Sequence, residues 1–237
     1  MRNVLFRDLG KMDFQTAWQY QESLLKENIA IKSLHRQNTD AGLLAATKDY
    51  LLFVEHPPVY TLGKSGHLSN LLISEEEMND RGIDFFHTNR GGDITFHGPG
   101  QIVAYLIFDL EYYQTDIGKY LRNLEEVVIR TLASYDIPGL RSAGETGVWI
   151  DSGIEGRARK ICAMGIRCSR WITMHGLALN VHTDLRYFDH IIPCGIENKR
   201  VSSIEAEVGR PVDMEVTKEL LKSAFADVFG VKMLTAG

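Results

Sequence analysis

The sequence predicts an α+β fold in which helices flank a mixed β-sheet, within a single domain that spans residues 1–237. Segments of strand-like composition follow one another instead of alternating regularly with helical segments, which disfavours a doubly wound fold. Three segments carry apolar residues at helical spacing. No internal repeat or long linker divides the chain, and its content of 44% hydrophobic and 24% charged residues is ordinary for a globular protein.

Three helices are predicted from apolar residues that recur every three or four positions. The first follows Asp13, a suitable N-cap residue. The second has the clearest amphipathic pattern and spans Ile117–Tyr135, and the third spans Val216–Val228 and is closed by Gly230. Residues 28–48 are polar and weakly patterned, which predicts a loop or a short helix.

Five runs between these helices have the composition of β-strands. They are rich in β-branched and aromatic residues and are bounded by Gly, Pro, Ser or Asp. These runs are Tyr50–Glu55, Gln101–Leu110, Gly147–Ile150, Lys160–Arg167 and Trp171–Val181.

Composition excludes several classes of protein. No apolar run approaches the 18 or so residues of a transmembrane helix, and the first residues lack the apolar stretch of a signal peptide. The net charge of −5 is unusual for a general nucleic-acid binder. The three cysteines have no regular spacing, which suits a reducing compartment. We therefore expect a cytoplasmic protein that binds neither membrane nor nucleic acid.

The most informative stretch is residues 90–101, RGGDITFHGPGQ, in which four of twelve residues are glycine. Glycine has no side chain to pack, so this density is useful where a backbone turns sharply or lies against a ligand. The stretch predicts a substrate-facing loop joined to the buried run that follows it. An ordinary turn is the alternative, and the spacing of a phosphate-binding loop is absent.

The cysteines differ in their surroundings. Cys162 and Cys168 lie in or beside a strand-like run and are expected to be small packed residues. Cys194 lies between Pro193 and Gly195, where a tight turn can present a thiol to a pocket. A thiol is a useful nucleophile only as the thiolate, which requires a nearby cation or base.

Lys160 is a candidate for that cation. By period-two alternation it shares a strand face with Cys162, Met164 and Ile166. An ammonium on such a face lies either at a wetted strand end or in a desolvated site, and a desolvated lysine can both stabilise a thiolate and accept a proton.

Histidine offers a competing arrangement. His97 and His175 are the plausible site residues, whereas the other histidines are expected to be structural or solvated. Neither C-x-x-C nor H-E-x-x-H occurs, so no metal site is predicted. A serine hydrolase is disfavoured because G-x-S-x-G is absent.

Five motifs in order carry a resemblance to a known family. They are HPPVYTLG at 56–63, RGGDITFHGPGQ at 90–101, KICAMG at 160–165, HGLALNV at 175–181 and PCGI at 193–196. Together they resemble the lipoyl(octanoyl) transferase family, over roughly residues 13–229. The resemblance implies the α+β fold shared with biotin protein ligase and lipoate ligase.

The resemblance also implies an activity: transfer of an octanoyl group from acyl carrier protein to a lysine of lipoyl domains. The acceptors it implies are the acyltransferase subunits of 2-oxoacid dehydrogenases and the glycine cleavage H protein. No cofactor is implied, because the donor thioester is already activated, and a monomer is expected.

By motif position, Cys194 corresponds to the acyl-thioester nucleophile and Lys160 to the lysine that lowers its pKa. Lys160 is then placed to take a proton from the acceptor amine. The resemblance assigns acyl binding to Arg90, Gly91, Gly92, Asp93, Ile94, Thr95, Phe96, His97, Ala163, Met164, Gly165, Gly176, Leu177 and Ala178.

Two alternatives remain open from the sequence. One is an ATP-dependent lipoate or octanoate ligase of the same fold, and the other is a non-catalytic protein that binds acyl carriers or lipoyl domains. Because both proposed partners are commonly acidic, a basic docking surface is expected, with a scattered, solvated set of charges as the alternative. Its candidate residues are Arg157, Arg159, Arg167, Arg170, Lys199 and Arg200.

Overall fold

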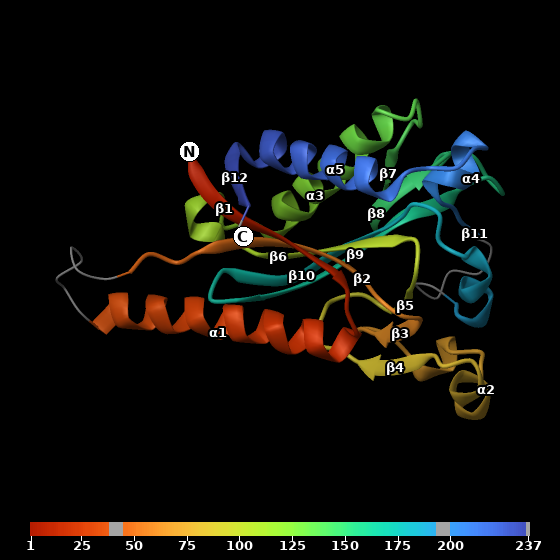
Figure 1. The fold of residues 1–237 in the computed structure, drawn as a ribbon, viewed down its shortest axis with the longest axis horizontal. Coiled ribbons are helices and arrows are strands. Elements are labelled where there is room, and N and C mark those ends of the chain that lie inside the picture. The colour runs from red at the N-terminus through yellow and green to blue at the C-terminus, as the bar shows by residue number, and fades with distance from the viewer. Residues whose placement is uncertain (38–44, 193–199, 236–237) are drawn as a thin grey trace.

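The computed structural model describes residues 1–37, 45–192 and 200–235 (Figure 1). In this part of the chain the main feature is a mixed nine-stranded sheet with the order β12-β1-β2-β6-β10-β9-β8-β7, and β11 pairs with β9 beside this path. β1 is parallel to both β12 and β2, whereas β2, β6, β10, β9, β8 and β7 pair antiparallel in turn. The strands are β1 Arg2–Lys11, β2 Asp49–Glu55, β6 Gln101–Ile107, β7 Leu140–Ser142, β8 Glu145–Ile150, β9 Arg159–Ser169, β10 Ile172–Asn180, β11 Arg200–Val201 and β12 Val231–Thr235.

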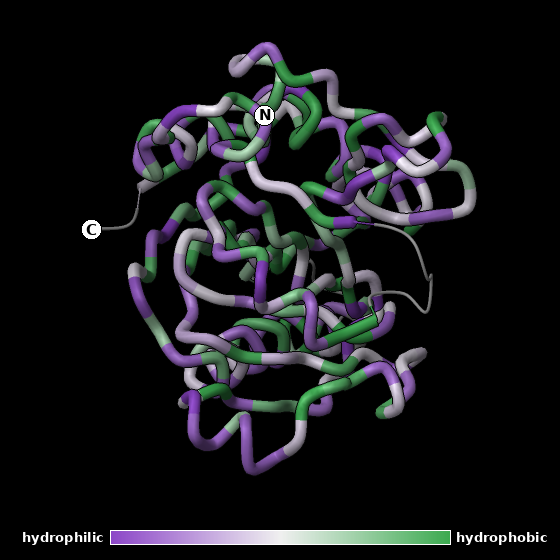
Figure 2. The backbone as a smooth tube through the Cα atoms, turned by 90° about the vertical axis from the view of Figure 1, so that its right-hand side faces the viewer, coloured by the Kyte–Doolittle hydropathy of each residue, from purple (hydrophilic) through white to green (hydrophobic). Residues whose placement is uncertain are grey.

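Helices cover both faces of this sheet, as Figure 1 shows. α3, Ile117–Ala133, and α5, Met214–Phe229, pack on one face with the larger hydrophobic core. α1, Phe14–Gln37, crosses the other face over a second core. Figure 2 shows short hydrophobic and hydrophilic stretches alternating along the backbone, as expected for elements with one face in the core and one in water. Shorter elements are α2 Glu75–Asp80, α4 Ile204–Val208 and 3₁₀ turns at Leu68–Asn70, Leu110–Tyr112 and Leu185–His190.

A second sheet of three strands lies beside the end of the large one. It has the order β4-β3-β5, where β3 is parallel to β4 and antiparallel to β5. The three strands are β3 Val59–Leu62, β4 Asp84–His87 and β5 Ile94–His97. β5 lies inside the glycine-rich stretch that the sequence predicted as a loop, because Ile94 and Phe96 are buried in the small sheet's own core.

Helix boundaries follow capping residues, of which Asp13 and Gly230 were predicted. Asp13 Oδ1 accepts a hydrogen bond of 2.8 Å from the Thr16 amide, and Asp116 Oδ1 accepts one of 3.0 Å from Lys119. α5 ends at Gly230, whose φ of 62° lies in the left-handed region that glycine adopts without strain. The five predicted strands are confirmed, with shifted ends.

The prediction of a loop or short helix from residue 28 was wrong for residues 28–37, which continue α1 to Gln37. Two of their polar side chains, those of Asn28 and Lys32, are buried with specific partners. Asn28 Nδ2 donates to the Lys48 carbonyl at 2.8 Å, and Lys32 Nζ lies 2.9 Å from Asp109 Oδ1. Buried polar groups are stable when their hydrogen bonds are made, so a polar sequence here forms a helix that faces the core.

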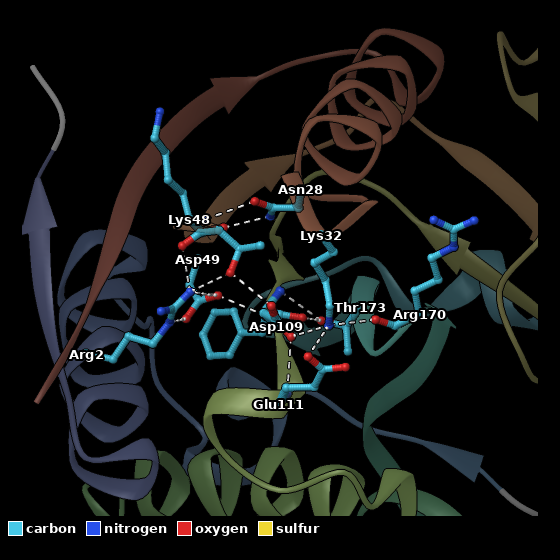
Figure 3. Close-up of polar contacts among 11 residues, drawn as sticks. Arg2, Asn28, Lys32, Lys48, Asp49, Asp109, Glu111, Arg170 and Thr173 are labelled. Atoms are coloured by element: carbon cyan, nitrogen blue, oxygen red, sulfur yellow. Dashed lines mark hydrogen bonds and ion pairs between the residues drawn. The ribbon is translucent and has the colours of Figure 1, made fainter. Parts of the chain in front are cut away.

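Lys32 and Asp109 belong to a buried network that joins the far end of α1 to the sheet (Figure 3). Arg2 pairs with Asp49, whose Oδ1 also accepts the Asp109 amide at 2.9 Å. Asp109 Oδ2 in turn accepts the Thr47 hydroxyl at 2.9 Å. The network ties the starts of β1 and β2 to the residues that follow β6.

Candidate active site

A cavity of about 510 Å³ lies between the small sheet and the β6-β10-β9 part of the large sheet. The glycine-rich stretch 90–101, called the glycine segment below, forms part of its wall. This volume is within the range of about 300–1,000 Å³ that is typical of small-molecule sites. The cavity brings together most of the site residues that the sequence singled out. They are Lys160, Arg90, Gly91, Gly92, Asp93, Ile94, Thr95, His97, Ala163, Met164, Gly165, Gly176, Leu177 and Ala178.

Two predicted site residues are not among the lining residues. Phe96 faces the small sheet's core, where its ring stacks on Tyr187 with centroids 4.5 Å apart. Cys194 lies outside the residues that the structure describes.

Hydrogen bonds hold the glycine segment against β3 and β9. The buried Arg90 donates from Nη2 to the Thr61 carbonyl at 2.6 Å and to the Thr61 hydroxyl at 2.9 Å. The Gly91 amide donates to the Ile166 carbonyl at 2.8 Å, so the segment lies alongside the edge of β9. A Cβ on Gly165 would lie only 2.7 Å from the Gly91 carbonyl oxygen, so this approach requires glycine.

Lys160 lies where the ladder between β8 and β9 changes register. Val148 pairs with Cys162 but Trp149 pairs with Lys160, so the two strands are offset by one residue between these pairs. A bulge of this kind redirects the side chains that flank it. Lys160 lines the cavity with Met164 and Ile166, but Cys162 does not, so the predicted sharing of one face by Lys160 and Cys162 was wrong.

Cys162 and Cys168 are packed residues, as the sequence indicated. Cys162 is fully buried in the large core, and burial raises the pKa of its thiol. Burial also raises the pKa of the Cys168 thiol. Neither is therefore suited to react as a thiolate near neutral pH.

His97 is a neutral, hydrogen-bonded group in the cavity wall. Burial lowers its pKa to about 3, with the neighbouring His56 adding to the shift. His97 Nδ1 lies 2.8 Å from Gln101 Oε1 and must donate to it, because an amide oxygen only accepts. Gln101 Nε2 donates to Asn180 Oδ1 at 2.9 Å, and Asn180 Nδ2 donates to the Ser202 carbonyl at 3.0 Å. Near neutral pH His97 is thus a neutral imidazole that its hydrogen bonds hold in place.

His175 is also buried in the wall, and burial lowers its pKa to about 3. Its Nε2 lies 2.7 Å from Asn89 Oδ1 and donates to it. Its φ of 61° is unusual for a residue other than glycine, and the amide is held by Gln21 Oε1 at 2.9 Å. His56, expected to be structural, is buried with a pKa lowered to about 4, mainly by burial.

Sequence reasoning missed several lining residues. Tyr105 and Val103 lie in an apolar run that resembles an ordinary buried strand, and Phe14 resembles a core residue of α1. Glu145 and Thr146 are the first residues of β8, and the polar character of this stretch was the one available indication that it faces a pocket.

The proposed basic docking residues do not form one patch. Arg167 and Arg170 lie towards one end of β9, whereas Arg157, Arg159 and Arg200 lie at the other. Several are paired: Arg159 lies 2.6 Å from Glu207, and Arg167 lies 2.6 Å from Glu22. These five favour the alternative of a scattered set, and Lys199 lies outside the described residues.

The described side chains contain no group of three or more His, Cys, Asp or Glu residues placed to hold a metal ion. Over residues 1–37, 45–192 and 200–235, none of the helices has the length and apolar character needed to cross a membrane.

The sequence is similar to those of known proteins over nearly its whole length. The model of the lipoyl protein ligase A/B catalytic domain matches residues 13–226. The octanoyltransferase of Christiangramia forsetii is 52% identical over 233 residues, which cover 98% of each chain. The chain belongs to the octanoyltransferase family. A second family member, the octanoyltransferase of Flavobacterium psychrophilum, is 53% identical over 96% of this chain and 97% of its own.

The fold of this octanoyltransferase family member is also found in solved ligases. A chain from the structure of a bipartite lipoate protein ligase and its E2 lipoyl domain, from Thermoplasma acidophilum, superimposes with a TM-score of 0.67. It is 18% identical, and the match covers 99% of this chain and 86% of that one. The fold prediction, a mixed sheet flanked by helices in the manner of lipoate ligases, is therefore confirmed.

Proposed function

We propose that this protein transfers an octanoyl group from octanoyl-acyl carrier protein to a lysine of a lipoyl domain, with residues 1–237 acting as one catalytic domain. The observation that carries the proposal is the placement of Lys160 on the wall of a glycine-lined cavity, in a chain 52% identical to an octanoyltransferase. In the proposal Cys194 is the nucleophile and Lys160 its cationic partner. The acceptors are the acyltransferase subunits of 2-oxoacid dehydrogenases and the glycine cleavage H protein, and the enzyme acts as a cytoplasmic monomer.

The cavity wall suits a flexible apolar chain. Leu177, Met164 and Val103 supply apolar surface, and Gly165 and Gly176 face each other on β9 and β10 without side chains that would narrow the space. Burial of methylene groups stabilises by about 0.8 kcal/mol each, so an octanoyl chain has a substantial driving force to enter.

The proposed chemistry consists of a thioester exchange followed by aminolysis of the acyl-enzyme, and the two steps balance. The Cys194 thiolate attacks the donor carbonyl, a new C–S bond forms, and the carrier thiolate leaves and takes a proton from the Lys160 ammonium. The acceptor amine then attacks the acyl-enzyme, the amide forms, the Cys194 thiolate leaves, and Lys160 recovers a proton from the amine. Because the donor is already a thioester, no nucleotide is required.

A transfer assay with a purified lipoyl domain tests this proposal. Octanoyl-acyl carrier protein is supplied without ATP, and in parallel octanoate is supplied with ATP. We expect acceptor modification only from the thioester donor, loss of transfer in Cys194→Ser, and a strong decrease in Lys160→Ala. The Cys168→Ser variant is the matched control and should retain activity. Modification only from octanoate with ATP would instead identify a ligase.

A further inference from the structure

Trp149 faces Lys160 directly across the β8–β9 ladder. The two residues are register partners, and the Lys160 Nζ lies 4.6 Å from the centroid of the Trp149 ring. The indole is 2% exposed, whereas the Lys160 side chain lines the cavity. An ammonium within about 6 Å of an indole face is attracted by the negative potential of that face.

β8, the strand that carries Trp149, is held in place by a contact with α3. Glu125 of α3 is fully buried, and its Oε1 accepts the Gly147 amide at 3.1 Å. Arg122 lies 2.8 Å from the other oxygen of the same carboxylate. Gly147 has a φ of 118°, and a Cβ there would lie 2.5 Å from the Cys162 carbonyl oxygen, so β8 and β9 are in close contact just before the register change. The indole therefore occupies a fixed position relative to Lys160.

A lysine side chain has four rotatable bonds and loses conformational freedom when it is fixed. A rigid indole beside the Nζ restricts those rotamers in advance. We propose that Trp149 is a positioning residue for Lys160, holding its ammonium at the cavity wall by a cation–π contact. This inference rests on the proposed function only in assigning Lys160 its role, because the contact itself is a feature of the fold.

Kinetics of three variants test the role. A cation–π contact contributes about 0.5–2 kcal/mol, so Trp149→Leu should lower kcat by about tenfold with little change in KM for octanoyl-acyl carrier protein. Trp149→Phe keeps an aromatic face and should recover at least a third of the wild-type kcat. Trp171→Leu is the matched control, at a partly exposed indole in the turn between β9 and β10, and should leave kcat unchanged. A kcat for Trp149→Leu within twofold of wild type, or a Trp149→Phe as poor as Trp149→Leu, would overturn the inference.

Fluorescence gives a second measurement that is independent of activity. The chain has three tryptophans, so Trp18→Phe with Trp171→Phe leaves Trp149 as the sole indole emitter. In that background Lys160→Met should change the intensity or wavelength of emission at neutral pH, whereas Lys160→Arg, which keeps a cation, should not. An unchanged spectrum in Lys160→Met would refute the contact while leaving octanoyl transfer intact. Failure of the unmodified enzyme to transfer the octanoyl group from octanoyl-acyl carrier protein would refute the proposed function without affecting this test.

Discussion

Single residues of the glycine segment matter as much for the side chains they lack as for those they carry. Arg90 uses its guanidinium to hold Thr61, and Gly91 binds the backbone of β9. This part of the cavity wall is therefore a backbone surface, fixed by an arginine that is buried in the protein. Sequence motifs indicated this segment as a site, but not that Arg90 serves its structure.

Gly165→Ala tests this account of the wall at the scale of one methyl group. The new Cβ would lie 2.7 Å from the Gly91 carbonyl oxygen, which must move. We expect a loss of about 1–3 kcal/mol in the free energy of unfolding, measured by urea denaturation, together with a raised KM for the octanoyl donor. Gly153→Ala is the matched control, because a Cβ there meets no atom within 4 Å. Equal stability and KM in the two variants would contradict the account.

At the scale of elements, the success of sequence prediction depended on whether a pattern reflects local or distant contacts. The amphipathic α3 and its Asp116 cap were predictable because both depend on neighbours in the chain. β1 was missed because only Val4 and Phe6 of its ten residues are buried. The register change beside Lys160 was missed because it depends on the pairing of β8 with β9, which no single strand reveals.

The buried ion pair between Lys32 of α1 and Asp109 gives a prediction about the stability of this helix. Lys32→Met removes the cation that lies 2.9 Å from Asp109, a carboxylate that is almost fully buried. Removing one partner of a buried ion pair typically costs about 3–5 kcal/mol, so the free energy of unfolding should fall by about that amount in urea denaturation. Lys26→Met, at an exposed position on the same helix, should change it by less than about 0.5 kcal/mol. Similar effects of the two substitutions would show that the network does not stabilise α1.

At the scale of the whole molecule, three buried neutral histidines link stability to pH. Folding lowers the pKa of His56 to about 4 and the pKa values of His97 and His175 to about 3, from an ordinary value of 6.5. The unfolded chain therefore binds more protons than the native one below pH 6.5. The stability that these groups contribute is present above that pH and is lost as the pH falls towards the folded-state pKa values.

We therefore expect the free energy of unfolding to decrease steeply between pH 6.5 and pH 4.5. Each histidine contributes a slope of up to about 1.4 kcal/mol per pH unit, or about 4 for the three together. Urea denaturation at pH 7, 6 and 5 measures this slope. His56→Gln should reduce it by about a third, whereas substitution of the exposed His87 by alanine should not. A stability that is flat over this pH range would show that these histidines are not buried in their neutral form.

The whole molecule also shows which part of the site was accessible from sequence. Five ordered motifs indicated the family, and the four that lie within the described residues hold residues that line or support one cavity. Tyr105 was missed because an aromatic residue in an apolar strand has the same pattern whether it faces a core or a pocket. Trp149 was missed because its contact with Lys160 depends on the pairing of β8 with β9. Their roles depend on which strands are adjacent, and adjacency is set by the whole fold.

The central claim, an acyl-enzyme on Cys194, is tested most directly by mapping the octanoyl group after an acid quench. Trypsin separates the three cysteines into the peptides 161–167, 168–170 and 187–199, which hold Cys162, Cys168 and Cys194 respectively. After incubation with octanoyl-acyl carrier protein and no ATP, we expect one octanoyl group, on peptide 187–199, that hydroxylamine removes and a lipoyl domain accepts. An octanoyl group on either other peptide, or transfer to the lipoyl domain with no octanoyl group on the enzyme, would contradict the account.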